Sequence, residues 1–234
     1  DIRYNVQIDT SNTFDSRSWD LSYASYTSSF PVTSQDTYPE GVAFSSDGTK
    51  MFILGTTNDT VYQYTLSTGW KVSTATYASK SLSVASEDSS SQGIAFNSDG
   101  TRMFMVGTGT DTVYQYNLST GWDISTAAYA TKSFSVSSQD TSPFGVTFNS
   151  DGTKMFIMGF AHDTVYQYTL STGFDLSPGN VSYASKSFSV TSQDTYPQGI
   201  AFNSDGTKMF IMGDSNNTVY QYTLSTGFDL SPGN

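Results

Sequence analysis

Apolar residues along this chain occur in short runs or alternate with polar residues, and no stretch has a helical period. Residues 50–55 contain the unbroken run Met51-Phe52-Ile53-Leu54, which is typical of a strand covered on both faces. Residues 79–84 alternate instead, with Leu82 and Val84 separated by serine, as expected for a half-exposed outer strand. The pattern predicts an all-β chain.

Four strands are predicted in each unit of the chain, at residues 41–45, 50–55, 60–66 and 79–84 in the first copy. The tight turn Ser46-Asp47-Gly48-Thr49 joins the first two, because Asp-Gly supplies a side-chain hydrogen bond and a positive-φ residue. The unit beginning at Gly41 returns after steps of 52, 52 and 54 residues. The copies begin at Gly93, Gly145 and Gly199. Tandem four-stranded antiparallel units at such a period favour a β-propeller.

The stretch Phe44-Ser45-Ser46-Asp47-Gly48-Thr49-Lys50-Met51-Phe52 resembles the strand–turn–strand element of the YVTN/NHL-like propeller superfamily and is similar to repeats of phage and bacterial surface proteins. The resemblance covers all four repeats and implies the fold only. The disulfide of hemopexin-type four-bladed propellers is excluded because the chain has no cysteine, and the WD40 signatures are absent as a set. We expect one propeller domain over residues 1–234, with 1–40 as an N-terminal segment.

The two ends of the chain are offset with respect to the repeat. Residues 26–32 have the pattern of a fourth strand without partners, whereas the last unit, 199–224, lacks a fourth strand. We expect residues 26–32 to lie alongside 218–224, because this closes a four-bladed ring and removes two exposed strand edges. Residues 2–8 alternate as a strand and would then add a fifth strand to the last blade. The alternative is a larger ring made by two or more chains.

Composition limits the classes of partner that the chain is expected to bind. The chain has 234 residues and a net charge of −11, which argues against nucleic acid and anionic membranes. Seven of the ten Lys and Arg residues stand at repeated positions, so no basic patch forms. No apolar run approaches the length of a membrane span and no signal-like start is present. We expect a monomer that does not insert into membranes, at an extracellular, virion or cell surface.

Variation among the four copies identifies a candidate binding face. The second-to-third-strand loops (56–59, 108–111, 160–163, 214–217) and the residues before each first strand vary, and both are expected on one face because antiparallel strands alternate in direction. A rigid scaffold with variable loops on one side is a common binding surface, although free drift of these loops would look the same. The candidate ligand-binding residues are Tyr38, Glu40, Asn58, Gln92, Thr110, Phe144, Phe160, His162, Tyr196, Gln198, Asp214 and Asn216.

The aromatic, amide and hydroxyl side chains of this set are suited to stacking on sugars and to hydrogen bonding with them. We therefore expect a non-enzymatic, lectin-like adhesion module that binds a glycan or cell-surface receptor multivalently and requires no cofactor. The alternative is a structural spacer or protein-interaction propeller. A glycan-processing enzyme is the remote alternative, because the carboxylates are spread evenly over equivalent repeats, whereas a glycosidase needs a pair at a set separation.

Four aspartates recur in the linker before each first strand and raise the question of a metal. These are Asp36, Asp88, Asp140 and Asp194. A ring of four carboxylates at the channel mouth would suit Ca²⁺ or another hard cation, but aspartate before a turn more often caps backbone amides. His162, the single histidine of the chain, is expected to be solvated rather than catalytic.

Repeated aromatic and amide residues are expected to be structural. Tyr62 and Tyr64 should pack between blades, and Gln63 should bridge neighbouring strands. The series Trp70, Trp122, Phe174 and Phe228 is expected to close the core on the face opposite the variable loops, with a second sugar-stacking ring as the alternative.

Overall fold

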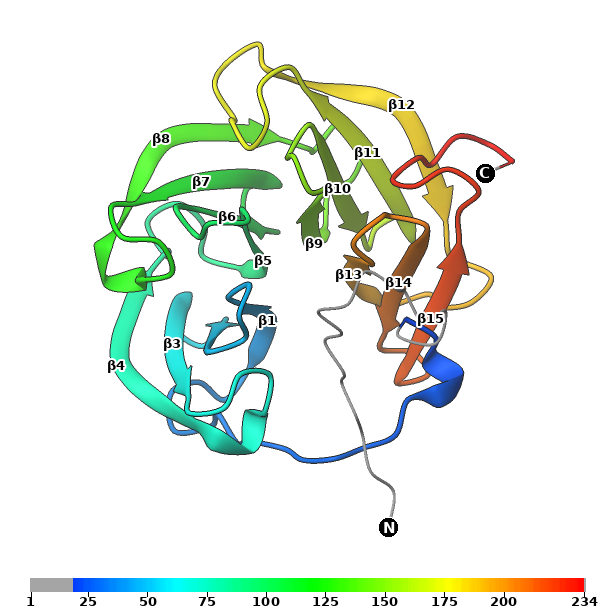
Figure 1. The fold of residues 1–234 in the computed structure, drawn as a ribbon. Coiled ribbons are helices and arrows are strands. Elements are labelled where there is room, and N and C mark those ends of the chain that lie inside the picture. Colours follow the sequence, from blue (N-terminus) through cyan, green and yellow to red (C-terminus); the bar gives the residue numbers. More distant parts are fainter. Residues whose placement is uncertain (1–18, 234) are drawn as a thin grey trace.

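The computed structural model describes residues 19–233, which form three four-stranded sheets and one three-stranded sheet arranged as propeller blades around a common axis (Figure 1). Blade 1 contains β1 (Pro39–Phe44), β2 (Lys50–Gly55), β3 (Thr60–Leu66) and β4 (Ala75–Ser83). Blade 2 contains β5 (Ser91–Phe96), β6 (Arg102–Gly107), β7 (Thr112–Leu118) and β8 (Ala127–Ser135). Blade 3 contains β9 (Pro143–Phe148), β10 (Lys154–Gly159), β11 (Thr164–Leu170) and β12 (Val181–Ser189). Blade 4 contains β13 (Pro197–Phe202), β14 (Lys208–Gly213) and β15 (Thr218–Thr223).

Three short 3₁₀ helices complete the described structure: η1 (Leu21–Tyr23), η2 (Val72–Thr74) and η3 (Ile124–Thr126). No helix of the described part is long and apolar enough to cross a membrane. The all-β propeller prediction is confirmed to this extent, with every strand pair antiparallel and the strands of each blade paired in chain order.

The turn between the first and second strands is built as predicted. Asp47 Oδ1 accepts hydrogen bonds from the amide of Thr49 at 3.0 Å and from its hydroxyl at 2.8 Å. Gly48 adopts a φ of +67°, a conformation that glycine adopts at little cost. The Trp70 ring lies over Gly48, so closely that a Cβ there would come within 2.4 Å of it. The aromatic series that begins at Trp70 therefore closes the turn side of each blade.

The fourth strand is longer than predicted because it contains a bulge. In blade 1, Gln63 pairs with Lys80 and Tyr64 pairs with Tyr77, so two extra residues lie on β4 between these pairs. Ser79, one of the two, has a φ of +56°. The bulge bends the outer strand. Because it interrupts the alternation of apolar and polar residues, the sequence pattern predicted only residues 79–84 and missed residues 75–78.

The core lies between blades rather than inside one. Phe52, Leu54 and Val61 of blade 1 form one buried cluster with Ile94 and Met103 of blade 2. Equivalent clusters join blade 2 to blade 3 and blade 3 to blade 4. The unbroken apolar run of the second strand is thereby explained, because the middle strands of blades 2 and 3 face a neighbouring blade on both sides.

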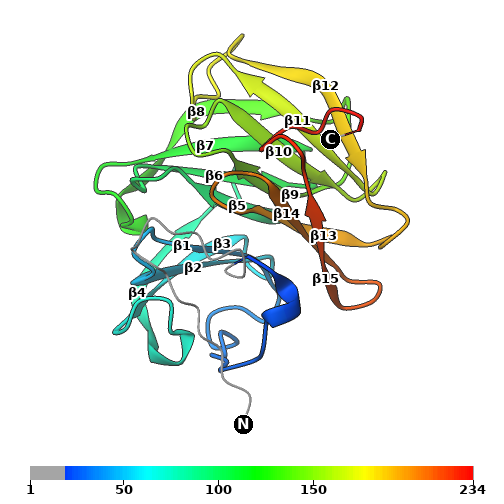
Figure 2. The same ribbon diagram turned by 45° about the vertical axis from the view of Figure 1, so that its right-hand side comes forward.

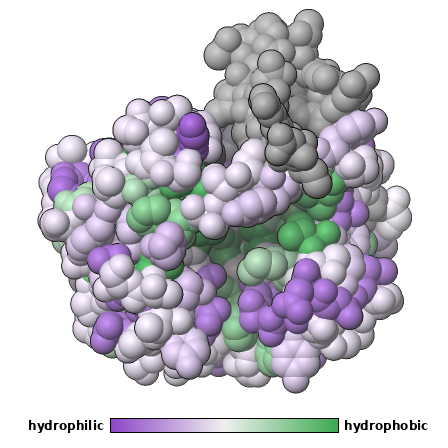
Figure 3. Space-filling view, turned by 90° about the horizontal axis from the view of Figure 1, so that it is seen from below, coloured by the Kyte–Doolittle hydropathy of each residue, from purple (hydrophilic) through white to green (hydrophobic). Residues whose placement is uncertain are grey.

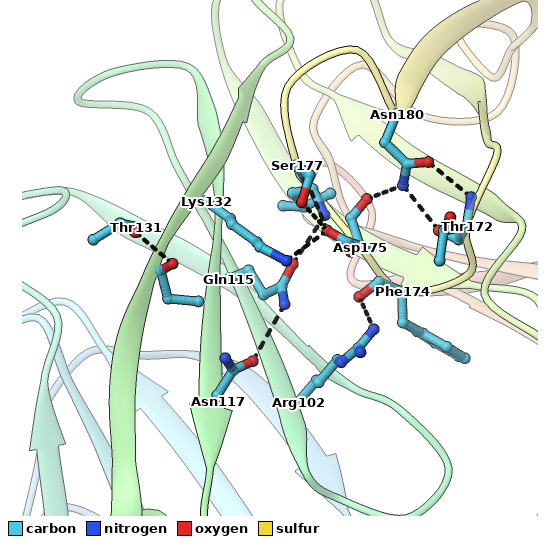
Figure 4. A network of polar contacts seen from close by, with 12 residues as sticks. Arg102, Gln115, Asn117, Thr131, Lys132, Thr172, Phe174, Asp175, Ser177 and Asn180 are labelled. Atoms are coloured by element: carbon cyan, nitrogen blue, oxygen red, sulfur yellow. Dashed lines mark hydrogen bonds and ion pairs between the residues drawn. The ribbon is translucent and has the colours of Figure 1, made fainter.

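Polar contacts fix the blades against one another on their outer side. Between blades 2 and 3, Gln115 Oε1 accepts the amide of Leu176 at 2.9 Å and Lys132 Nζ lies 2.9 Å from Asp175 Oδ1 (Figure 4). Arg102 Nη1 donates to the carbonyl of Phe174 at 2.7 Å in the same network. The glutamine series was predicted to bridge neighbouring strands, but Gln63, Gln115 and Gln167 each accept an amide from a loop of the next repeat instead.

The predicted completion of blade 4 is not what the structure shows. Within residues 19–233, blade 4 has three strands, and β15 is its outer edge. Residues 26–32 are not a strand, and Phe30 and Val32 pack on Met51 and Ile53 of blade 1. In Figures 1 and 2 no described strand lies between blade 4 and blade 1, and the blue N-terminal segment runs from one to the other on the outside; this position is here called the opening. The strand expected at residues 2–8 lies outside the described residues.

Candidate functional site

The variable loops share one face of the propeller, here called the loop face. It carries the loops 56–59, 108–111, 160–163 and 214–217 and the linkers that precede each first strand. Linker and loop touch within a blade: the hydroxyls of Thr37 and Thr57 are 3.1 Å apart, and those of Thr195 and Ser215 are also 3.1 Å apart. The predicted co-location of the two variable segments therefore holds.

The four recurrent aspartates are buried beneath this face, with 1–2% of each residue exposed. Asp88 shows their role, because its carboxylate accepts the amides of Ser90 at 2.8 Å, Gly109 at 3.1 Å and Thr110 at 2.9 Å. Gly107 makes room for it, since a Cβ there would come within 2.4 Å of the carboxylate carbon. The aspartates are thus buried caps that join each linker to a loop.

Asp88 and Asp140 each accept amides from a loop of their own blade, which is the capping role expected of an aspartate before a turn. Within residues 19–233 no group of three or more His, Asp or Glu is placed to hold a metal ion. The hard-cation hypothesis stays a prediction, and the amide contacts of Asp88 and its equivalents favour the capping alternative.

Blade 3 differs from the other blades at one of these caps. Asp140 accepts the amides of Ser142, Ala161 and His162, and its Oδ2 also lies 3.1 Å from Nδ1 of the His162 ring. The carboxylate is fully buried, whereas the His162 side chain is 62% exposed. A buried carboxylate thus orients a solvent-facing imidazole, an arrangement that holds a histidine in one tautomer.

Three aromatic rings lie beside this pair and link blade 3 to blade 4. The Phe160 ring centroid is 5.3 Å from that of Phe144 and 5.0 Å from that of Tyr196. Phe144 and Phe160 are half-buried, and Tyr196 is exposed. The structure therefore brings together three of the predicted binding residues, Phe144, Phe160 and Tyr196, as an apolar platform, and His162 follows Phe160 by two residues in the same loop.

The remaining predicted residues are spread over the face. Tyr38, Asn58, Thr110, Asp214 and Asn216 are exposed, and Glu40, Gln92 and Gln198 are half-buried. Burial raises the pKa of Glu40 above its usual range, and the nearby charges of Asp214 and Asp36 add to the rise. Thr110 bonds to the buried Asp88 through its hydroxyl at 2.6 Å. These residues do not form one site with His162.

Sequence reasoning missed the partnership between Asp140 and His162. The signal was present in the repeat, because His162 follows Asp140 by the same number of residues as Thr110 follows Asp88. A residue at this position lies against the buried carboxylate, as both Thr110 and His162 do. Reading His162 as an isolated solvated histidine overlooked this register.

The larger hollow in this part of the protein is on the opposite face. It measures about 230 Å³ and is lined by Phe148, Phe202 and Phe228 with serine, threonine and asparagine side chains. No residue that lines it is titratable. This hollow therefore offers no group able to move a proton, whereas the loop face offers His162.

No protein-family model matches the chain, and no curated protein is similar to it in sequence. Its fold is similar to that of a Bacteroides fragilis protein described as a “putative 6-phosphogluconolactonase”, with a TM-score of 0.54 and 14% identity over 88% of this chain and 58% of that one. A Bacteroides uniformis protein of the same description has a TM-score of 0.52 and 11% identity over 79% and 50%. Hydrazine synthase of Kuenenia stuttgartiensis has a TM-score of 0.52 and 15% identity over 85% and 49%.

The prediction of a non-enzymatic, lectin-like adhesion module is wrong. Two of the similar structures are described as putative lactonases and one as a synthase, and nothing in these descriptions supports adhesion to glycans. The expectation of a non-enzyme also finds no support, since these names point towards catalysis. At 11% to 15% identity the likeness itself establishes the fold, and the chain spans about half the length of the proteins that it resembles.

Proposed function

We propose that the loop face of blades 3 and 4 carries a site for the hydrolysis of a neutral lactone, in which His162 is the general base. The single observation that carries this proposal is the contact between buried Asp140 and exposed His162, at 3.1 Å. The names of two structures with the same fold supply the substrate class.

Each residue of the cluster has a defined role. Asp140 accepts from Nδ1 of His162, so Nε2 is the nitrogen available to take a proton from water. The water oxygen bonds to the lactone carbonyl carbon, the ring C–O bond breaks, and the leaving oxygen takes the proton back from the imidazolium. Water and lactone thus become one hydroxy acid. The platform of Phe160 and Tyr196 offers an apolar surface to the C–H face of the ring.

Charge on the loop face argues for a substrate without phosphate. None of the variable loops or described linkers of this face contains Lys or Arg. Glu40 lies on this face, and its pKa is raised first by burial and then by the nearby negative charges of Asp214 and Asp36. A phosphorylated lactone would be repelled, so an unphosphorylated aldonolactone is the expected substrate.

The proposal is tested by following the ring opening of glucono-1,5-lactone and of its 6-phosphate against the spontaneous rate. We expect catalysis of the neutral lactone only. His162→Gln should lower kcat/KM by roughly 10²- to 10⁴-fold, the usual contribution of a general base, and leave the midpoint of thermal unfolding unchanged.

Asp88→Asn is the matched control for Asp140→Asn, because both carboxylates cap a loop but only Asp140 contacts a histidine. Both variants should lose stability, and only Asp140→Asn should lose activity. Lactonase activity that survives His162→Gln, or an absence of activity in the native chain towards a panel of neutral lactones, would overturn the proposal.

A further inference from the structure

The N-terminal segment contacts blade 4 in the way that a following blade would. Its Trp19 ring lies 6.1 Å from Phe210, as Phe228 of blade 4 lies 6.2 Å from Phe156 of blade 3. The amide of Leu21 donates to Gln221 Oε1 at 3.0 Å, as that of Leu230 donates to Gln167 Oε1 at 2.9 Å. Residues 19–22 thus occupy the position of a third-to-fourth-strand loop in a blade after blade 4.

The same segment contacts blade 1 in the way that a preceding blade would. Phe30 meets Tyr64 edge to face at 5.6 Å, as Phe134 of blade 2 meets Tyr168 of blade 3 at 5.6 Å. The Tyr64 hydroxyl also donates to Gln35 Oε1 at 3.1 Å, and its blade 3 equivalent makes the same bond at 3.1 Å. Residues 30–36 thus occupy the position of a fourth strand and linker in a blade before blade 1.

Residues 19–36 are continuous, so the blade after blade 4 and the blade before blade 1 are one and the same. The ring therefore has a fifth position whose outer layer is built, while its first three strands are missing from the described residues. The walls of this position are apolar and exposed: Val42 of blade 1 is 58% exposed, and Met212 and Val219 of blade 4 are 44% and 49% exposed. Their equivalents inside the array, such as Ile94 and Val165, are 7% and 0% exposed.

Figure 3 is seen from the side of this opening and shows hydrophobic residues gathered in a hollow between polar outer surfaces. The outer strand of blade 4 borders the same opening, because no described strand pairs with β15 in the way that β4, β8 and β12 pair with β3, β7 and β11. An unpaired edge beside an exposed apolar face is suited to receive β-strands.

We infer that this opening receives one further repeat of the same kind as residues 181–227. Such a unit would supply a fourth strand to β15 and the first three strands of a fifth blade, which residues 19–32 then complete. Residues 228–233 occupy the same place in the repeat as residues 174–179, and β12 begins soon after residue 179, at Val181. The interfaces formed would continue those already present between blades 1, 2, 3 and 4.

A second copy of this chain fits the opening less well. If residues 26–32 of another copy paired with β15, its residues 19–22 would fall on the site in blade 3 that Phe228 and Leu230 of the same chain already fill. A larger ring of two chains also conflicts with the segment 19–36, because that segment touches both walls and leaves room for one blade position between them.

The test appends a copy of residues 181–227 to the chain after Asn234. We expect a monomer with a higher midpoint of thermal unfolding and amide exchange in β15 that is about tenfold slower or more. In the original chain Met212→Ala should hardly change the midpoint of thermal unfolding. In the extended chain it should lower that midpoint as much as Met158→Ala does. A scrambled extension of the same composition is the control and should do none of this.

Three results would overturn the inference. The first is an extended chain no more stable than the scrambled control. The second is a chain with two appended repeats that is more stable than the chain with one, since this would mean a sixth position. The third is dimerisation of the original chain with protection of Val42 and Met212, measured by light scattering and hydrogen exchange, since this would make a second copy the occupant.

Discussion

Blades 3 and 4 share the same middle strands and yet bury them differently. Residues 154–159 and 208–213 both read Lys-Met-Phe-Ile-Met-Gly, and residues 164–169 and 218–223 both read Thr-Val-Tyr-Gln-Tyr-Thr. Met158 is fully buried, whereas Met212 is 44% exposed. Val165 is likewise buried and Val219 is 49% exposed. Since the local sequence is identical, the neighbouring blade alone sets the burial.

The opposite face of the same strands gives the internal control. Met209 and Ile211 of blade 4 are buried in one cluster with Phe156 and Met158 of blade 3. Blade 4 is therefore a normally formed blade that lacks a neighbour on one side. Hydrophobic stabilisation in this protein belongs to interfaces between repeats, as in other repeat arrays.

The largest expected effect is at the matched methionines. Met158→Ala should lower the free energy of unfolding by about 2–5 kcal/mol, the usual cost of truncating a buried methionine. Met212→Ala should change it by less than about 0.5 kcal/mol, as at an ordinary surface position. Urea titration of the two variants measures the difference, and equal losses would mean that Met212 is covered in solution.

A smaller effect is expected at the matched glutamines. Gln167 is buried and accepts the amide of Leu230, so Gln167→Ala leaves a buried N–H unpaired and should cost about 1–3 kcal/mol. Gln221 is half-buried and makes the same bond to Leu21. Gln221→Ala should lower the midpoint of thermal unfolding by less than Gln167→Ala does, because water can reach the freed amide of Leu21. It should also speed proteolysis between residues 19 and 36.

The fold was predictable from the sequence where the physical cause lay within one repeat. The Asp-Gly turn at Asp47 and the unbroken apolar run from Met51 both follow from local chemistry. The partner of Gln63 does not, because its Oε1 accepts the amide of Ile124 in the next blade. The fate of residues 26–32 did not, because the same pattern suits a fourth strand in blade 4 or in a separate blade. Contacts of Trp19 and Leu21 with blade 4 decide between these, and short sequence periods carry no information about such distant partners.

The candidate site was predictable in place but not in chemistry. The variation of the loops located the loop face, and Phe144, Phe160 and Tyr196 do meet there. The pair Asp140 and His162 was missed because its chemistry depends on the burial of one partner and the exposure of the other. Burial of Asp140 is a property of the linker docking on its blade, which composition does not encode.

Carboxyl groups on the two faces should respond oppositely to pH. Hydrogen bonds from the Lys186 ammonium and the Ser231 hydroxyl hold the pKa of Asp229 at about 2, so its stabilising contribution is present above the usual value of 3.8 and is lost as pH falls towards 2. The pKa of Glu40 is raised, mainly by burial. The native state then holds its proton more tightly than the unfolded chain, and Glu40 costs stability as pH rises above its usual 4.5.

Two variants separate these contributions. Glu40→Gln should increase stability at neutral pH and have no effect well below pH 4.5. Asp229→Asn should lower stability at neutral pH and make the acid limb between pH 3.8 and 2 shallower. Thermal melts from pH 2 to pH 8 measure both, and parallel curves for the two variants and the native chain would contradict the assigned causes.

The smallest effect is expected at the salt bridges that join neighbouring blades. Lys132 lies 2.9 Å from Asp175 across the interface of blades 2 and 3, and Lys186 lies 2.9 Å from Asp229 across that of blades 3 and 4. The two lysine side chains are 31% and 32% exposed, so each pair should contribute about 0.2–1 kcal/mol and weaken in salt. Lys132→Met and Lys186→Met should therefore cost nearly the same. A clear excess at Lys186 would show that the open side of blade 4 loosens the whole blade, because the local geometry of the two bridges is alike.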